Sequence, residues 1–485
     1  MRCVVFGGTG YIGGRLVPEL LEDGYDVCVV ARSPEKIQGV PWESAVDIVA
    51  GDVTDRDSVA EVLEANDVVY YLVHSLNNAD FADMDRRAAA NVADAATRAK
   101  VRRLIYLGGI VPAEGEMSEH LTSRNEVGQI FLDSAVPTTV LQSAIIIGSG
   151  SASFEMLRYL TERLPAMVAP RWVHNRVQPI AVRDVLHYLV RAAQTPWSGS
   201  HTFDIGGPDV LTYVDMMRRY AAISGLTRRL VVPVPFLSPW WSAQWVNLVT
   251  PVPRSIAVPL IESLIHELVC REHGVSAYIP DPSQGLTSYE QAVRLALARI
   301  QNADVPTRWS DAAWPAAPSD PLPTDPEWSG GSVYVDERER RTEATPETLW
   351  KVIESIGGES GWYSFPLAWT VRGWADRLGG GVGLRRGRRD PYRLTVGEAL
   401  DWWRVESLER PQLLRLRAEM KLPGLAWLEL MVDSTEDGTT VFRQRAIFEP
   451  HGFGGHLYWK SISPFHGIVF GGMARNITSS AEKSA

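Results

Sequence analysis

Two residues in the first half of the chain carry side chains suited to proton transfer and to binding a cofactor. His120 and Arg124 stand four positions apart in the segment HLTSRNEVG. A histidine exchanges protons near neutral pH, because its ordinary pKa is about 6.5, whereas arginine keeps its charge and binds hydroxyl or anionic groups. The pair therefore suggests a general acid beside a cofactor clamp. The alternative is that both lie on the solvated face of an amphipathic helix, opposite Val127 and Phe131.

The first strand-like run leads into a glycine-rich turn, VVFGGTGYIGGRLVPELL. Gly7, Gly10 and Gly13 follow the pattern GxxGxxG between a strand and an amphipathic helix. Glycines permit the tight turn and let backbone amides approach a pyrophosphate, whose charge then lies at the helix N-terminus. The pattern predicts a dinucleotide-binding loop, and packing of the turn is the other explanation. The loop residues expected at the cofactor are Gly7, Thr9, Gly10, Tyr11, Ile12 and Gly13.

The second strand ends at Arg32 and Ser33, where a protein that binds NAD usually has an acidic side chain for the ribose 2'-hydroxyl. A guanidinium is suited to a 2'-phosphate, which it binds through charge-assisted hydrogen bonds. We therefore predict that NADP(H) is preferred, with NAD(H) as the alternative cofactor. The competing interpretation of Arg32 is a solvated surface cation.

Further cofactor contacts are expected where later strands end. Ligands of open parallel sheets bind at the carboxyl ends of the strands, and the adenine is expected close to the end of the third. We expect His74 to be a loop residue at the cofactor and not a catalyst. The residues at these strand ends are Asp52, Val53, Leu72, Val73 and His74.

The elements that must position these side chains follow an alternating order. Strand-like runs such as CVVFGG, DVCVVAR, VDIVAGD, DVVYYLVH and RRLIYLGG are separated by amphipathic segments, which predicts βαβ crossovers and a doubly wound parallel sheet. We assign this α/β domain to residues 1–300, with a small substrate-side subdomain at about 208–280. Residues 301–331 are rich in Pro, Ser, Asp and Gly and form a linker by composition. Residues 332–480 contain short runs in which apolar and polar residues alternate. These runs predict an α+β domain with an antiparallel sheet and a closing C-terminal helix.

Composition excludes several classes of function. The 485 residues carry a formal net charge of -10, which disfavours nucleic acid as a partner. Only 3 cysteines occur and no CxxC pair, which argues against a metal site or a disulfide framework. The chain opens directly on a strand without a signal peptide, so a cytoplasmic location is expected.

The most apolar stretch, residues 231–265, is cut repeatedly by proline, so a membrane-spanning helix is not expected. We interpret it as part of a buried substrate-side subdomain. Peripheral membrane contact through Trp240, Trp241 and Trp245 is the alternative.

The motifs FGGTGYIGG, ARSPEK, GDVTD, QPIAVRDV and FDIGGPD together resemble atypical short-chain dehydrogenase/reductases. The likeness covers roughly residues 1–300 and is greatest to NmrA-like and complex I 39-kDa-subunit-like NAD(P)-binding proteins. The region after residue 333 is similar to the DUF2867 domain, and its order of elements is similar to the START-like helix-grip fold.

The resemblance implies a catalytic Ser at the end of the fifth strand and a TyrxxxLys pair on the next helix. Here Gly108 and Gly109 occupy the Ser position, while His120 and Arg124 stand near the Tyr and Lys positions. The likeness therefore suggests His120 as general acid and Arg124 as cofactor clamp, without the usual triad. A quinone or flavin acceptor would relax the need for an acid, because it can be protonated from solvent.

The resemblance also implies that the segment WVHNRVQPIAVRDV lines the substrate side. Its candidate substrate contacts are His174, Asn175 and Gln178, and loop polarity alone is the alternative explanation for them.

Two features of the C-terminal region could bind ligands. Its tryptophans could line an apolar cavity, as the helix-grip likeness implies, or pack in the core. The second feature is a glycine-rich basic segment that could contact an anion or the first domain, or form a solvated hairpin. Its arginines are Arg385, Arg386, Arg388 and Arg389.

Three functions fit these observations. The first is an NADP(H)-dependent oxidoreductase with an apolar, quinone- or lipid-like substrate. The second is a non-catalytic NAD(P)H-binding redox sensor or assembly factor. The third is a carrier of lipids or polyketides whose nucleotide site is vestigial. We favour the first.

Overall fold

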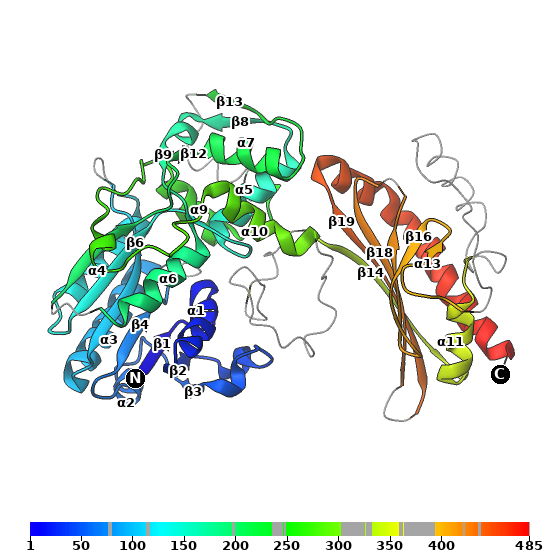
Figure 1. The fold of residues 1–485 in the computed structure, drawn as a ribbon, viewed down its shortest axis with the longest axis horizontal. Helices are drawn as coiled ribbons and strands as arrows, with labels where there is room; N and C mark the ends of the chain where they lie inside the picture. The colour runs from blue at the N-terminus through cyan, green and yellow to red at the C-terminus, as the bar shows by residue number, and fades with distance from the viewer. Residues whose placement is uncertain are drawn as a thin grey trace. The chain divides into compact units, whose positions relative to one another are not determined.

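The structure is a computed structural model, and it describes residues 1–75, 80–112, 117–195, 199–234, 246, 249–301, 325, 332–357, 362, 393–420, 422–434 and 438–484. The chain divides into two compact units, residues 1–331 and 332–485 (Figure 1). Each unit is described by itself.

The first unit contains a seven-stranded sheet in the order β11-β6-β5-β4-β1-β2-β3, and every neighbouring pair in it is parallel. This confirms the doubly wound α/β fold predicted from the alternation of strands and helices. The strands are β1 (Arg2–Phe6), β2 (Asp26–Ala31), β3 (Asp47–Ala50), β4 (Val68–Tyr71), β5 (Arg103–Gly109), β6 (Thr138–Ser143) and β11 (His201–Ile205).

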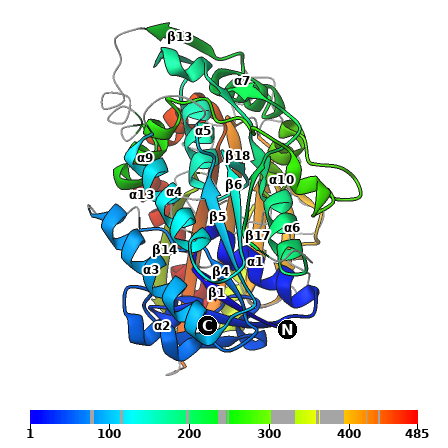
Figure 2. The same ribbon diagram turned by 90° about the vertical axis from the view of Figure 1, so that its left-hand side faces the viewer.

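Helices cover both faces of this sheet (Figure 2). Alternate residues of β1 point to opposite faces, so Cys3 and Val5 pack on one side and Val4 and Phe6 on the other. The first face carries α1 (Tyr11–Glu22) and α6 (Val182–Ala192), and the second carries α2 (Arg56–Val62), α3 (Phe81–Ala99) and α4 (Glu119–Leu132).

The strand order creates a switch point beside β1. The chain passes from β1 to β2 and β3 in one direction and then crosses to β4 on the other side of β1. The loops that follow β1 and β4 therefore leave the sheet in opposite directions and open a crevice at its carboxyl edge. This crevice is where a parallel sheet of this kind binds a ligand.

The expected strand TTVLQSAIIIG is broken. It forms β6 up to Ser143 and then, after two residues, the short β7 (Ile146–Ile147), which pairs with β10 (Ile180–Ala181) outside the main sheet. The chain leaves the main sheet here and forms a smaller layer, which consists of three two-stranded sheets and the helices around them. Its other strand pairs are β8 (Ala166–Pro170) with β13 (Leu230–Val234), and β9 (Arg176–Val177) with β12 (Leu211–Thr212).

Helices enclose this smaller layer around an apolar core of their own. They are α5 (Ala152–Arg163), α7 (Tyr213–Ile223), α9 (Arg254–Ser263) and α10 (Tyr289–Gln301). Short 3-10 turns connect elements of the unit at η1 (Pro34–Ile37), η2 (Glu43–Ala45), η3 (Arg171–His174) and η4 (Gly274–Ala277).

One residue of the Pro-rich segment is described, and it is tied to the first unit. Both carboxylate oxygens of Asp325 accept hydrogen bonds from the Arg15 guanidinium, at 2.8 and 2.6 Å, and both side chains are buried. Arg15 lies on α1, directly after the glycine loop. The segment predicted as a linker is therefore anchored at this residue.

The second unit contains an antiparallel sheet in the order β14-β19-β18-β17-β16-β15. Helices α11 (Pro346–Glu354) and α13 (Gly452–Ser484) pack with it, and α13 is the closing helix expected from the sequence (Figure 1). The strands are β14 (Tyr334–Thr342), β15 (Ala399–Leu400), β16 (Trp403–Glu409), β17 (Leu413–Ala418), β18 (Gly424–Ser434) and β19 (Thr440–Pro450).

Tryptophans of this unit take part in its core. Trp350, Trp362, Trp402 and Trp403 belong to one buried cluster, and the rings of Trp362 and Trp402 stack at 5.6 Å. These four tryptophans therefore pack in the core, which is one of the two roles expected for the tryptophans of this region. The arginines Arg385, Arg386, Arg388 and Arg389 lie outside the described residues, as do Trp240, Trp241 and Trp245.

No helix among the described residues is both long enough and apolar enough to cross a bilayer. The three cysteines are free thiols, with Cys3 and Cys28 buried and Cys270 partly exposed.

Candidate functional site

Two glycines of the loop between β1 and α1 leave no room for a side chain. Gly7 has φ of +94°, and a Cβ there would lie 2.8 Å from the carbonyl group of Leu72. A Cβ on Gly13 would lie 2.2 Å from the carbonyl oxygen of Gly7. Gly10 caps the helix without a side-chain hydrogen bond, so the first amides of α1 stay available to an anion. The loop therefore has the geometry expected of a pyrophosphate site.

A cleft of about 440 Å³ opens over this loop at the carboxyl edge of the sheet. It collects side chains from the ends of β1, β2, β3, β4 and β5, which the strand order brings together. Of the predicted cofactor residues, those lining the cleft are Gly7, Thr9, Gly10, Tyr11, Ile12, Arg32, Asp52, Val53, Leu72, Val73, His74 and Arg124. Gly13 and Ser33 are adjacent in the chain to lining residues without lining the cleft themselves.

Arg32 lies at one end of the cleft, near Asp52. Its side chain is exposed, and no ion pair joins it to any residue in the described ranges. Asp52 instead accepts two hydrogen bonds from Thr54, both of 2.8 Å, from the backbone amide and the hydroxyl. The guanidinium of Arg32 is therefore free to bind an anion.

Arg124 lies at the other end of the cleft. Its guanidinium donates a hydrogen bond of 2.6 Å to the carbonyl oxygen of Leu107 on β5, and the phenol of Tyr106 donates to the Arg124 carbonyl oxygen at 3.1 Å. A Cβ on Gly109 would lie 3.7 Å from the Arg124 side chain and 3.2 Å from Leu121. Glycine at the family's Ser position thus leaves space for the arginine.

His74 and His120 form a pair beside this end of the cleft. Their Nε2 atoms lie 3.1 Å apart, and the rings stack with centroids 5.1 Å apart. His74 Nδ1 lies 2.9 Å from the carboxylate of Asp85 on α3, which also accepts the amide of Ser75 at 3.1 Å. His120 Nδ1 lies 2.9 Å from the hydroxyl of Ser263 at the end of α9. A hydrogen-bonded chain therefore runs from Asp85 through both imidazoles to Ser263.

The tautomers of the pair follow from its partners. Asp85 accepts a hydrogen bond from Nδ1–H of His74, which leaves His74 Nε2 as an acceptor. In a neutral pair, Nε2 of His120 then carries the proton between the two rings, and the Ser263 hydroxyl shares its proton between His120 Nδ1 and the Pro259 carbonyl oxygen, which lies 2.8 Å away. Burial lowers the pKa of His120 well below its ordinary value, and His74 and Arg124 lower it further. Burial also lowers the pKa of His74, against the opposing effect of Asp85. Both imidazoles are therefore neutral at neutral pH.

The structure corrects one interpretation of His120. The alternative of a solvated helix face is wrong for this residue, because His120 is only 6% exposed and faces the neighbouring elements. His120 does not line the cleft, and both of its ring nitrogens bond to protein groups, so His74 lies between it and the ligand space. Its role as general acid stays a prediction, and any such role would be exerted through His74.

The buried pair predicts a specific effect of pH on stability. An unfolded chain binds a proton on each imidazole at pH below about 6.5, whereas the folded pair has lowered pKa values. The pair's contribution is therefore fully present above about pH 6.5 and is lost as the pH falls below it. We expect the melting temperature to fall less steeply between about pH 6.5 and 5 in His120→Gln than in the wild type. Calorimetry checks this.

Asp85 and Arg124 are the charged groups facing the pair, and both stay in the variant. The exposed His174 gives the matched control, His174→Gln, which should keep the wild-type slope. Equal slopes in all three proteins would contradict a buried neutral pair.

The predicted substrate contacts lie elsewhere. Asn175 donates a hydrogen bond of 2.5 Å to the Ile265 carbonyl oxygen. Gln178 is buried, donates to the Gly207 carbonyl oxygen at 2.8 Å and accepts from the Cys270 amide at 3.1 Å. His174 is exposed, and none of these predicted residues lines the cleft. Asn175 and Gln178 hold backbone segments together, so the polarity of this loop reflects structure at these two positions.

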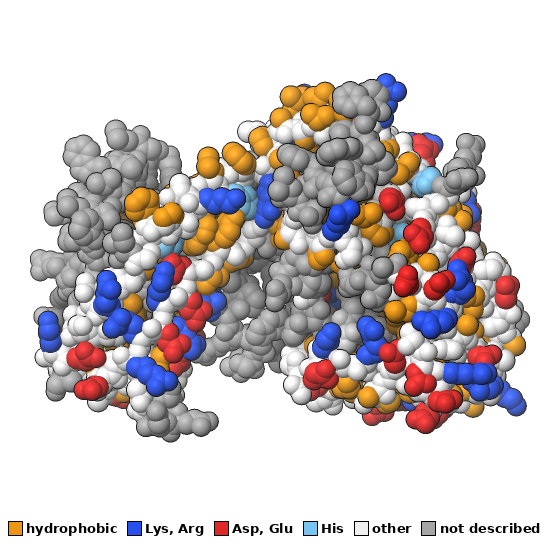
Figure 3. Space-filling view, turned by 180° about the vertical axis from the view of Figure 1, so that it is seen from behind, with side chains coloured by type: hydrophobic (Ala, Val, Ile, Leu, Met, Phe, Trp, Pro, Cys, Tyr) orange, Lys and Arg blue, Asp and Glu red, His pale blue; other side chains and the backbone are white. Residues whose placement is uncertain are grey.

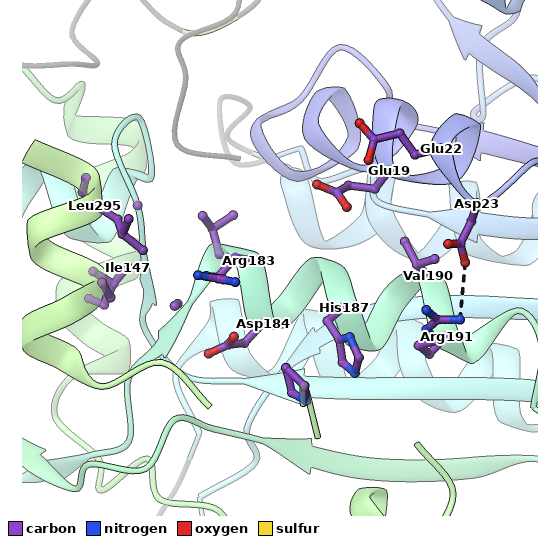
Figure 4. Close-up of a pocket in the computed structure, with 16 residues that line it drawn as sticks. Glu19, Glu22, Asp23, Ile147, Arg183, Asp184, His187, Val190, Arg191 and Leu295 are labelled. Carbon is purple, nitrogen blue, oxygen red and sulfur yellow. Dashed lines mark ion pairs between the residues drawn. The ribbon is translucent and has the colours of Figure 1, made fainter. Parts of the chain in front are cut away.

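A second, polar groove of about 490 Å³ lies between α1, α6 and α10 (Figure 4). The acidic end of α1, with Glu19 and Asp23, lies across from Arg183 and Arg191 on α6, and Asp23 pairs with Arg191 at 3.6 Å. The groove shares no lining residue with the nucleotide cleft. Its charges of both signs are typical of a solvated surface and do not point to one ligand.

Two family models match separate parts of the chain. Residues 7–141 match the NAD(P)H-binding family, and residues 328–473 match the family described as a protein of unknown function, DUF2867. These matches confirm the resemblance of the first region to NAD(P)-binding proteins and of the second region to the DUF2867 domain.

Relatives of the first unit are identical to it at about a quarter of the aligned positions. An uncharacterized protein of Mycobacterium tuberculosis is 27% identical over 235 residues, which are 48% of this chain and 24% of that protein. The chain thus spans about a quarter of the length of this relative. The mitochondrial NADH dehydrogenase [ubiquinone] 1 alpha subcomplex subunit 9 of Arabidopsis thaliana is 24% identical over 48% of this chain and 60% of its own length. A ceramide reductase of Caulobacter vibrioides is 27% identical over 47% of this chain and 72% of its own length.

Proposed function

We propose that the protein is an oxidoreductase that prefers NADP(H) and acts on an apolar, quinone- or lipid-like substrate. The observation that carries the cofactor preference is Arg32, which is exposed at the end of β2 and has no ion-pair partner among the described residues. A dinucleotide in the cleft would have its ribose 2'-position near this side chain. The relative named ceramide reductase supports a lipid-like substrate.

The residues of the cleft fit a dinucleotide along its whole length. The amides at the start of α1 would bind the pyrophosphate, and Asp52 and Val53 would lie beside the adenine. Arg124 would bind ribose hydroxyls or a negative charge developing on a substrate oxygen. The bound cofactor would supply the hydride. The side chains of this chain position it and provide the polar surroundings of the reacting atoms.

The histidine pair gives the reaction end of the cleft a defined polarity. Because both imidazoles are neutral, the pair adds no charge that would oppose a hydride donor or the Arg124 cation. Asp85 fixes the tautomer of His74, the member of the pair that lines the cleft. We therefore assign His74 to contact with the substrate or nicotinamide, and His120 and Asp85 to positioning it.

A second function is favoured by one specific observation. All four ring nitrogens of the pair bond to protein groups, so no imidazole N–H points to the cleft in this structure. An NADP(H)-binding sensor or assembly factor would need no proton donor there. Turnover of NADPH in the presence of an acceptor distinguishes the two functions.

The cofactor preference is tested by Arg32→Ala. We expect the Kd for NADPH to rise about tenfold or more, because a charge-assisted contact to the 2'-phosphate is lost, and the Kd for NADH to stay within about twofold. Titration of both nucleotides by fluorescence measures this. Arg56→Ala, a change on the nearby α2 surface outside the cleft, is the matched control and should alter neither Kd. An unchanged NADPH to NADH ratio in Arg32→Ala would remove the assignment.

A further inference from the structure

An apolar pocket of about 610 Å³ lies in the smaller layer of the first unit, apart from the nucleotide cleft. Its walls come from α5, β8, η3, α7, β13 and α9, and none of the described residues that line it is charged. The volume is within the range of about 300–1,000 Å³ that is typical of small-molecule sites. A ligand that fills it must be apolar over most of its surface.

Two polar atoms of the lining residues have no hydrogen-bond partner among the residues that the structure describes. The hydroxyl of Tyr213 on α7 and the indole Nε1 of Trp172 on η3 are both buried and unpaired. Tyr213 itself is only 5% exposed, and burial raises its pKa, so the phenol keeps its proton. Leaving a buried donor unpaired costs about 1–3 kcal/mol, so a partner at this position is expected. The two unpaired donors favour a ligand that carries one hydrogen-bond acceptor.

The mouth of the pocket exposes apolar side chains. Val168 on β8 is 55% exposed and Val232 on β13 is 45% exposed, and both line the pocket. Figure 3 shows hydrophobic side chains gathered over these two strands. Such side chains would be covered by the part of an elongated apolar molecule that extends beyond the cavity.

Helix α9 links this pocket to the nucleotide cleft. Ile261 and the C-cap residue Leu264 line the pocket, while Ser263 between them binds His120. His120 in turn binds His74, which lines the cleft. A displacement of α9 by a ligand would therefore move a direct contact of the histidine pair.

We propose that the pocket binds a fatty acyl chain through its apolar walls and its carbonyl group through Tyr213 or Trp172, and that its occupancy alters nucleotide affinity through α9. The ligand lies on a different side of α9 from the histidine pair, so it acts as an effector and not as the reduced substrate. The link between pocket occupancy and nucleotide affinity rests on the proposed function, because it requires a nucleotide in the cleft. Binding of the acyl chain in the pocket does not depend on that function.

Binding is tested with the methyl ester of dansyl-labelled undecanoic acid, displaced by methyl palmitate, on the full chain, because an uncharged ester carbonyl matches a pocket without charged lining residues. We expect saturable binding that is lost in Met167→Trp, which fills the pocket from β8. Val210→Trp is the matched control, since Val210 is exposed and does not line the pocket. Either Tyr213→Phe or Trp172→Phe should weaken binding about fivefold, the effect of one hydrogen bond, and unchanged binding in both variants would remove the carbonyl contact. Absence of binding, or equal binding by the Met167→Trp and control variants, overturns the pocket.

The link is tested by titrating NADPH with and without saturating methyl palmitate. We expect the Kd for NADPH to change about fivefold or more, a usual size for coupling between sites, and the change to disappear in Ser263→Ala. An unchanged Kd in the wild type, or an equal shift in the variant, overturns the link. If the ligand-free protein does not bind NADPH, the proposed function and the link both fail, whereas absence of methyl palmitate binding overturns the pocket and the link but not the proposed function.

Discussion

Gly13→Ala should weaken NADPH binding at least about 30-fold. A Cβ at this position would lie 2.2 Å from the carbonyl oxygen of Gly7, a contact that only a backbone shift can relieve. That shift moves the amides that would bind the pyrophosphate, and displacement by about 1 Å is enough to lose most of such an interaction. Fluorescence titration with NADPH gives the Kd, and circular dichroism shows whether the variant is folded.

Gly454→Ala controls for the loss of a glycine in general. A Cβ on Gly454 in α13 would meet no atom within 4 Å, so nucleotide binding should be unchanged. A folded Gly13→Ala protein that binds NADPH as tightly as the wild type would show that the nucleotide does not lie on this loop.

Asp85→Asn should lower kcat about 30-fold or more while the Kd for NADPH stays within about twofold. The carboxylate accepts Nδ1–H of His74, whereas an amide can donate to the same nitrogen and thereby favour the other tautomer. His74 would then carry its proton on Nε2, where it opposes the proton of His120 Nε2. Loss of a tautomer-fixing carboxylate can reduce kcat by orders of magnitude, as in serine proteases. Steady-state kinetics with NADPH and an active acceptor measure this.

Asp94→Asn is the matched control on the same helix. Asp94 is exposed and pairs with Arg56 at 2.6 Å, far from the histidine pair along α3. A purely structural role of Asp85 would lower the melting temperature without separating kcat from KM or altering the pH profile. A kcat for Asp85→Asn within about twofold of the wild type would contradict the positioning role.

The nucleotide cleft could be predicted from sequence because its signals are local. The glycine loop is encoded within seven residues, and Arg32 directly follows a strand whose position is recognisable. The position of His74 at the cofactor can be predicted from the same kind of local signal, because this residue follows the fourth strand. What places these segments together is the strand order, and alternating strands and helices largely determine it.

The histidine pair could not be predicted, because its contacts are long-range. His74 and His120 are 46 positions apart, and Ser263 is 143 positions from His120. No pattern within one element indicates such contacts. The burial of His120 also could not be predicted from α4 itself. Apolar and polar residues follow one another irregularly along this helix, so its sequence does not indicate which face is buried.

The polar loop after Trp172 cannot be assigned a role from its sequence for a different reason. Polar residues in a loop suggest exposure to a substrate, yet Asn175 and Gln178 bind backbone groups of neighbouring segments. Buried backbone groups need partners wherever strands are as short as β9 and β12. Sequence alone does not distinguish a side chain that serves the backbone from one that serves a ligand.

Oxidation of NADPH by the purified full chain, followed by absorbance with a panel of quinones and carbonyl compounds, tests the central claim most directly. We predict oxidation matched by reduction of at least one apolar acceptor, about tenfold faster with NADPH than with NADH at equal low concentrations, and absent in Gly13→Ala. Tight NADPH binding without oxidation by any acceptor would contradict the assignment as an oxidoreductase and favour the sensor.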